Sequence, residues 1–142
     1  FTLIELIVTA GIGLVILSYI TINLLSSQRS SAKSAIVLQM ISDLKTQQLK
    51  SMTGAQNAST FGVRFANGFY TLFGSTDDLN VSLDNSISIS SNFPGNTITF
   101  SPLSGEIQSF VNGQNNIFIS DNTDGTAFTL GVNKYGVVES KN

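Results

Sequence analysis

The chain has 142 residues, of which 42% are hydrophobic and only 11% are charged, and its net charge is -2. Seven scattered Lys and Arg residues argue against a nucleic-acid surface, which needs clustered basic side chains. Cysteine and histidine are both absent, which excludes a disulfide framework, a thiolate nucleophile and a Cys or His metal site.

The first 25 residues read as an apolar helix. No charged side chain occurs at residues 6–25, and about 20 residues at about 1.5 Å rise per residue cover the hydrocarbon core of a bilayer. The polar residues within the run can bond to the helix's own carbonyl groups or to those of a neighbour; they are Thr9, Ser18, Thr21 and Asn23. The chain begins at Phe1 without a basic segment, so we expect a leader to be removed ahead of the apolar run.

Glu5 stands at the edge of this apolar run. A carboxylate there is disfavoured in hydrocarbon and usually marks a specific partner. The alternative is an interfacial Glu in a plain membrane anchor, close to the α-amino group of Phe1.

The segment Phe1-Thr2-Leu3-Ile4-Glu5, followed by an uncharged helix, resembles the mature N-terminus of type IV pilins and pseudopilins. The resemblance implies that a prepilin peptidase cuts before Phe1 and methylates its amine, and that Glu5 neutralises the Phe1 amine of an adjacent subunit. It implies a homo-oligomeric filament with minor pilins, a membrane platform protein and an assembly ATPase. The residues expected in the filament core are Leu3, Leu6, Ile7, Ala10, Leu14 and Leu17.

Two features depart from that family's pattern. Many proteobacterial pilins close the C-terminal region with a disulfide, and this chain has no Cys. Pilins commonly have a Pro near position 22, where the helix unwinds in the filament; here Ile22 occupies that position. Local melting would therefore depend on Gly11, Gly13 and Ser18.

Residues 26–53 continue the helix, because no Pro precedes Pro94 and Gly54 supplies the first stop signal. At 100° per residue the apolar side chains gather on one side, interrupted by Lys45 and Gln48. That predicted core face consists of Val37, Leu38, Met40, Ile41, Leu44, Leu49 and Met52.

After Gly54 the pattern alternates as in strands. Residues 60–65 and 69–73 flank Asn67-Gly68, which predicts a hairpin with a type I′ turn. Further strands are expected at residues 81–83, 86–90, 97–100, 106–111, 116–120, 127–132 and 135–139. The predicted class is α+β: a helix of residues 1–53, with 1–25 as a stem and 26–53 packed under a head. The head, residues 54–142, is an antiparallel sheet or small sandwich.

Segments of the head resemble GspH/FimT-type pseudopilins and minor pilins. They are residues 98–105, 116–119 and 130–138. The resemblance implies a structural subunit of a type IV pilus that serves adhesion, motility or DNA uptake. The alternatives are a pseudopilin of a type II secretion or competence endopilus, and a monomeric anchored binding domain. The expected location is the cytoplasmic membrane, followed by an extracellular filament, without direct binding of nucleic acid.

Signals for other chemistry are weak. No catalytic residue, cofactor or metal is expected, because Ser104 has no evident base and only Glu106 and Asp124 could pair as carboxylates. Asp121-Asn122-Thr123-Asp124-Gly125 partly resembles a calcium loop, but a plain Asp-Gly turn is favoured. Glycosylation sequons begin at Asn57 and Asn80. Candidate adhesive aromatics are Phe69 with Tyr70, or Phe110 with Phe118, against a simple role in the core.

Overall fold

The computed structural model describes residues 2–54, 60–74, 78–123 and 125–141, and only the backbone at 21–32, 140 and 141. The contacts divide the chain into two compact units, residues 1–36 and residues 37–142. The class is α+β, as predicted: helix together with antiparallel sheets.

A single helix, α1 (Leu3–Thr53), includes the whole apolar run and the amphipathic segment after it. Its end follows the predicted signal, since Gly54 has a φ of 63°, the left-handed conformation that a C′ glycine adopts at low cost. The helix therefore ends at the predicted residue, Thr53, and begins two residues after the predicted start.

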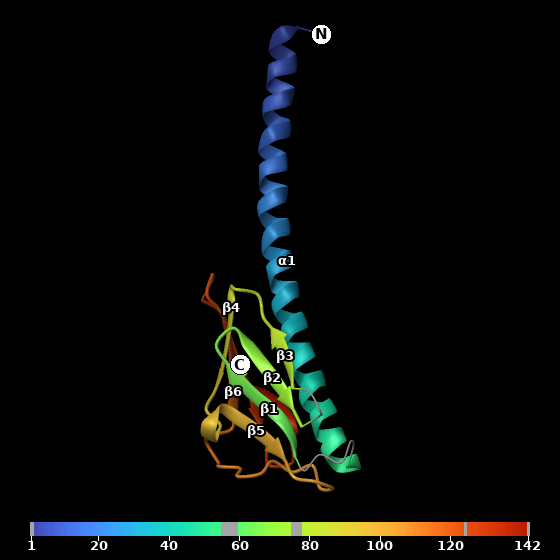
Figure 1. Cartoon of the computed structure of the whole chain (residues 1–142). Helices are drawn as coiled ribbons and strands as arrows, with labels where there is room; N and C mark the ends of the chain where they lie inside the picture. Colours follow the sequence, from blue (N-terminus) through green and yellow to red (C-terminus); the bar gives the residue numbers. More distant parts are fainter. Residues whose placement is uncertain (1, 55–59, 75–77, 124, 142) are drawn as a thin grey trace. The chain divides into compact units, whose positions relative to one another are not determined.

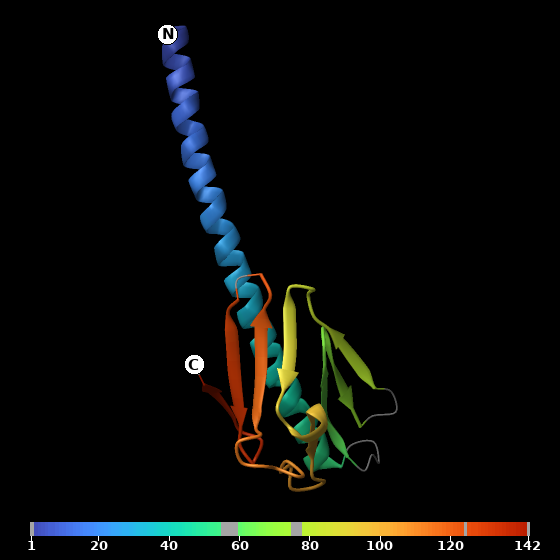
Figure 2. The same ribbon diagram turned by 90° about the vertical axis from the view of Figure 1, so that its left-hand side faces the viewer.

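Eight strands form two antiparallel four-stranded sheets in the second unit (Figure 1). The first sheet has the order β3-β2-β1-β5, and the second has the order β4-β6-β7-β8. Figure 2 separates the sheets, with β4, in yellow, between the green strands and the orange to red strands. The strands are β1 (Phe61–Ala66), β2 (Phe69–Phe73), β3 (Leu79–Ser82), β4 (Ile87–Ser91), β5 (Thr97–Phe100), β6 (Asn116–Asp121), β7 (Ala127–Val132) and β8 (Val138–Lys141).

The strand predicted at residues 106–111 is wrong. Ile107 makes one isolated bridge to Phe100, and its N–H donates to the Lys134 carbonyl instead of a ladder partner. Ser109 has a φ of 55°, which is incompatible with continued extended backbone. The strands predicted at 81–83 and 135–139 are displaced, and Gly136 forms a turn with Asn133 before β8 begins.

The hairpin of β1 and β2 is confirmed, but its predicted turn type is wrong. Ala66 pairs with Phe69, which leaves Asn67 and Gly68 as a two-residue turn. Gly68 has a φ of 80°, whereas Asn67 is not among the described residues with positive φ. A type I′ turn requires positive φ at both positions, so this turn places the left-handed residue only at the glycine.

The apolar face of the first sheet carries Val63, which lies in register with Leu72 and Ile98. The second unit's part of α1 packs through a stripe of four buried side chains, Met40, Leu44, Gln47 and Ser51. Residues at this spacing lie on one side of a helix.

The predicted core face of α1 is wrong in part. Leu38, Leu49 and Met52 are 67%, 60% and 44% exposed, although the apolar pattern places them in the core. The buried side of the helix is instead the side of Met40, Leu44, Gln47 and Ser51, and of its two polar side chains the buried Gln47 Oε1 has no hydrogen-bond partner among the described residues. Ser51 Oγ donates to the Phe100 and Ser101 carbonyls, at 3.2 and 2.8 Å, at the end of β5.

Candidate functional site

The start of α1 is capped by Thr2. The Thr2 carbonyl accepts from the amides of Glu5 and Leu6 at 3.1 and 3.3 Å, and Thr2 Oγ1 lies 3.4 Å from the Glu5 nitrogen. A Thr followed three residues later by Glu is the spacing of a capping box, and a carboxylate in the first turn also complements the helix dipole. The sequence signal for this cap is the Thr-x-x-Glu spacing.

The segment Leu3–Ile20 is long and apolar enough to cross a membrane, with a mean hydropathy of 2.3 and no residue buried. Two of its polar side chains bond to the helix's own carbonyl groups. Thr9 Oγ1 donates to the Glu5 and Leu6 carbonyls, and Ser18 Oγ donates to the Leu14 carbonyl. Apolar surface therefore faces outward around this part of the helix.

The predicted filament-core residues share one side of this segment. At 100° per residue, their side chains leave the axis within about 60° of that of Leu3. Glu5 leaves the axis on the opposite side, about 180° from Leu14, and its side chain is exposed. A single flat partner could not contact both the apolar stripe and Glu5, whereas several surrounding helices could. Phe1 lies outside the described residues.

The helix is continuous through the positions considered for local melting. Gly11, Gly13 and Ser18 all lie within α1, and the backbone at Ile22 is helical. A Cβ added at Gly11 or Gly13 would meet no atom within 4 Å, so neither glycine is required by a close contact inside the chain.

Asp121 and Glu106, from the calcium-like loop and the candidate carboxylate pair, have ordinary structural surroundings. Asp121 is buried and its Oδ1 accepts from the Thr123 amide at 2.7 Å, while the Gly125 amide donates to the Asp121 carbonyl, which is the geometry of a turn. Among the described residues no three acidic, His or Cys side chains group as metal ligands. Glu106 pairs with Lys134 at 3.5 Å, and Asp124 lies outside the described residues.

Asn80 of the second sequon is exposed on β3, where its Oδ1 accepts from Thr71 Oγ1 at 2.7 Å. Asn57 lies outside the described residues. The prediction of Tyr70 as a candidate adhesive aromatic is wrong, because its side chain lies in the core and is 1% exposed. Phe69 and Phe118 are 39% and 37% exposed, and Phe110 is partly exposed.

No family model, curated protein or solved structure matches the chain. Its function is therefore inferred from its own residues and geometry.

Proposed function

We propose that this chain is a structural subunit of a type IV pilus filament, held in the cytoplasmic membrane before assembly and exposed on the cell surface afterwards. The observation that carries the proposal is the segment Leu3–Ile20, whose apolar side chains are exposed while Glu5 stands at its start. Residues 1–25 would form the stem, and residues 26–53 would support a head of residues 54–142.

The mechanism is an exchange of surroundings for the stem. In the membrane lipid covers the apolar side chains, and in the filament the stems of neighbouring copies cover them. Because lipid tails are as apolar as Leu, the hydrophobic contribution nearly cancels between the two states. Close packing can still favour the bundle, while the direction of assembly comes from the platform protein and the ATPase.

Glu5 would set the register of assembly. Burying a carboxylate without a partner in an apolar bundle costs on the order of several kcal/mol. A carboxylate beside the Phe1 amine of a neighbouring copy is compensated by the opposite charge. The position of Glu5 opposite the stripe of Leu3 and Leu14 supports a bundle with neighbours on several sides.

Two substitutions at Glu5 separate assembly from capping. Gln can take the Glu position of a capping box but has no charge, whereas Ala removes the charge and the capping-box side chain and keeps only the bonds from the residue 5 amide to Thr2. We expect Glu5→Gln and Glu5→Ala both to insert in the membrane and both to lose incorporation into filaments, measured as sheared filament yield against membrane-fraction protein. Normal assembly of Glu5→Gln would contradict the charge-pairing role, and normal assembly of both variants would contradict any role of Glu5 in assembly.

A further inference from the structure

A groove of about 410 Å³ opens between the two sheets of the second unit. Its lining consists of residues 65–67 at the end of β1, residues 88–90 in the middle of β4, and Asn96. These side chains are amides, hydroxyls and hydrocarbon, so the lining has no charge.

Uncharged polar groups point into solvent at the groove. Asn67, Ser90 and Asn96 are exposed, and each can both donate and accept hydrogen bonds. Asn96 is held in place, because its N–H donates to the Phe93 carbonyl at 2.9 Å and its Oδ1 accepts from Ser91 Oγ at 3.4 Å.

The free edge of β4 adds backbone N–H and C=O groups to the polar side chains of the groove. The Asn122 N–H donates to the Ser86 carbonyl and the Asn92 N–H donates to the Asn116 carbonyl, so even-numbered residues of β4 direct their peptide groups toward β6. The peptide groups of Ile89 consequently face the other edge. β4 ends the order of its sheet, so that edge carries no strand neighbour among the described strands.

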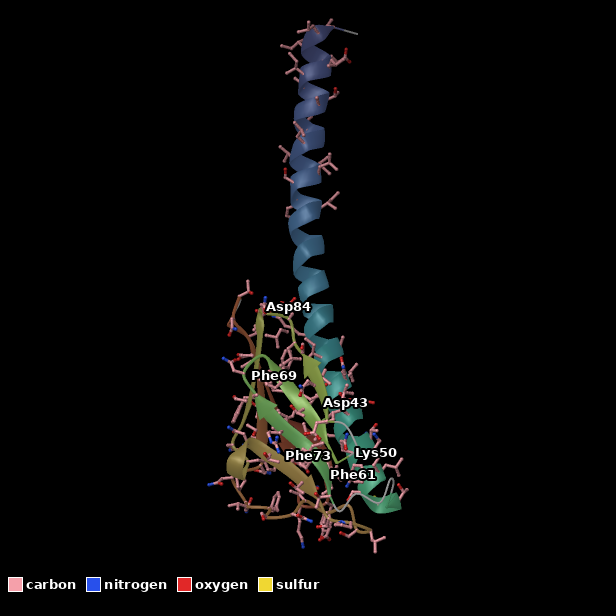
Figure 3. The ribbon with its side chains drawn as sticks, viewed as in Figure 1. Asp43, Lys50, Phe61, Phe69, Phe73 and Asp84 are labelled. Atoms are coloured by element: carbon pink, nitrogen blue, oxygen red, sulfur yellow. The ribbon has the colours of Figure 1, made fainter. Side chains whose placement is uncertain are left out.

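One partly exposed phenylalanine flanks each side of the groove. Phe69, labelled in Figure 3 beside the β1–β2 turn, lies opposite Ala66 of the lining. Phe118 lies opposite Ser90 of the lining. Directly opposed residues of antiparallel strands have their side chains on the same face, about 5 Å apart at Cβ, so both rings stand next to the groove. Their exposure is 39% and 37%.

We propose that this groove binds a neutral saccharide. A charged ligand would find no countercharge in the lining, and a wholly apolar ligand would leave the amides and the free peptide groups without partners. A pyranose ring offers neutral hydroxyl groups to the asparagines and Ser90, and an apolar face to the aromatic rings. This assignment does not depend on filament assembly.

Titration of the isotope-labelled full chain with lactose, maltose and cellobiose tests the proposal. The chain is held in dodecylphosphocholine micelles, which have no sugar headgroup, and backbone amide shifts are followed by NMR. We expect saturable shifts with at least one disaccharide, concentrated at residues 65–67, 88–90 and Asn96. The absence of such shifts with all three sugars would overturn the proposal.

Ser90→Arg fills the groove from an exposed position, and Thr129→Arg is the matched control. Thr129 lies on the same face of the same sheet but on the far side of Phe118. We expect Ser90→Arg to weaken binding at least tenfold with unchanged amide shifts elsewhere in the head, and Thr129→Arg to bind as the original chain does. Phe118→Ala is expected to weaken binding severalfold. Equal affinity of Ser90→Arg and the original chain would place the saccharide elsewhere and refute the assignment.

Discussion

Tyr70 connects β2 to α1 through one partly buried hydrogen bond. The side chain is 1% exposed, and its hydroxyl donates to Asp43 Oδ2 at 2.5 Å. Burial and the adjacent Asp43 carboxylate raise the pKa of Tyr70 well above its ordinary value of 10.0. A hydrogen bond to a charged group contributes about 1.5–3 kcal/mol. Because Asp43 is only half-buried, we expect Tyr70→Phe to lower the free energy of unfolding by about 1.5 kcal/mol at pH 7.

The same bond predicts the pH dependence of this difference. The folded state holds the phenol neutral, while an unfolded Tyr ionises at a pKa of about 10, so the contribution of Tyr70 is complete below that pH. Above it the original chain loses about 1.4 kcal/mol per pH unit relative to Tyr70→Phe, until the phenol ionises in the folded state. The free energies of unfolding of the original chain and of Tyr70→Phe should therefore become equal about one pH unit above 10, and above that pH Tyr70→Phe should be the more stable.

Urea unfolding of the full chain in micelles, followed by near-ultraviolet circular dichroism at pH 7, 9, 10 and 11, measures both effects. Tyr135→Phe is the control, because Tyr135 is 64% exposed. Equal stability of Tyr70→Phe and the original chain at pH 7, or a gap that stays constant up to pH 11, would refute the reasoning.

Two matched pairs test the packing of α1 by the same unfolding assay. Leu44 is 2% exposed, and Leu44→Ala should lower the free energy of unfolding by about 2–5 kcal/mol. Leu38 is 67% exposed, and Leu38→Ala should lower it by less than about 0.5 kcal/mol. Equal losses would contradict the observed burial of Leu44 and exposure of Leu38. Gly136→Ala should lower the free energy of unfolding by at least about 1 kcal/mol more than Gly113→Ala does. Both glycines have positive φ, but only a Cβ at Gly136 would overlap the Gln48 amide that donates to the Tyr135 carbonyl. Similar losses at the two glycines would show that the Gln48 contact contributes little.

The elements with strong local signals were predictable. The uninterrupted run before Gly54 defines α1, and Asn67-Gly68 between alternating segments defines the first hairpin. In both cases the residues that determine the structure are neighbours in the sequence. The apolar segment Leu3–Ile20 was predictable for the same reason.

The buried side of α1 was predictable only in part: Met40 and Leu44 are buried as predicted, but the rest depends on partners distant in the sequence. In the sequence Gln48 is a polar interruption of the predicted apolar side, and Ser51 gives no signal. Their partners are distant carbonyl groups, those of Gly105 and Tyr135 for Gln48 and those of Phe100 and Ser101 for Ser51. A hydrophobic pattern gives no signal for such bonds, and it equally assigns exposed leucines to the core. The groove between β1 and β4 arises from the pairing of two sheets, which the strand pattern alone does not define.

The central claim is most directly tested by mass spectrometry and electron microscopy of filaments sheared from the surface of the native cell. The pilus account predicts this chain in those filaments, beginning at an N-methylated Phe1. Its presence as the dominant species would make it the main subunit. Filaments that lack the chain, with all of it in the membrane fraction, would contradict the account and favour a pseudopilin of a secretion endopilus.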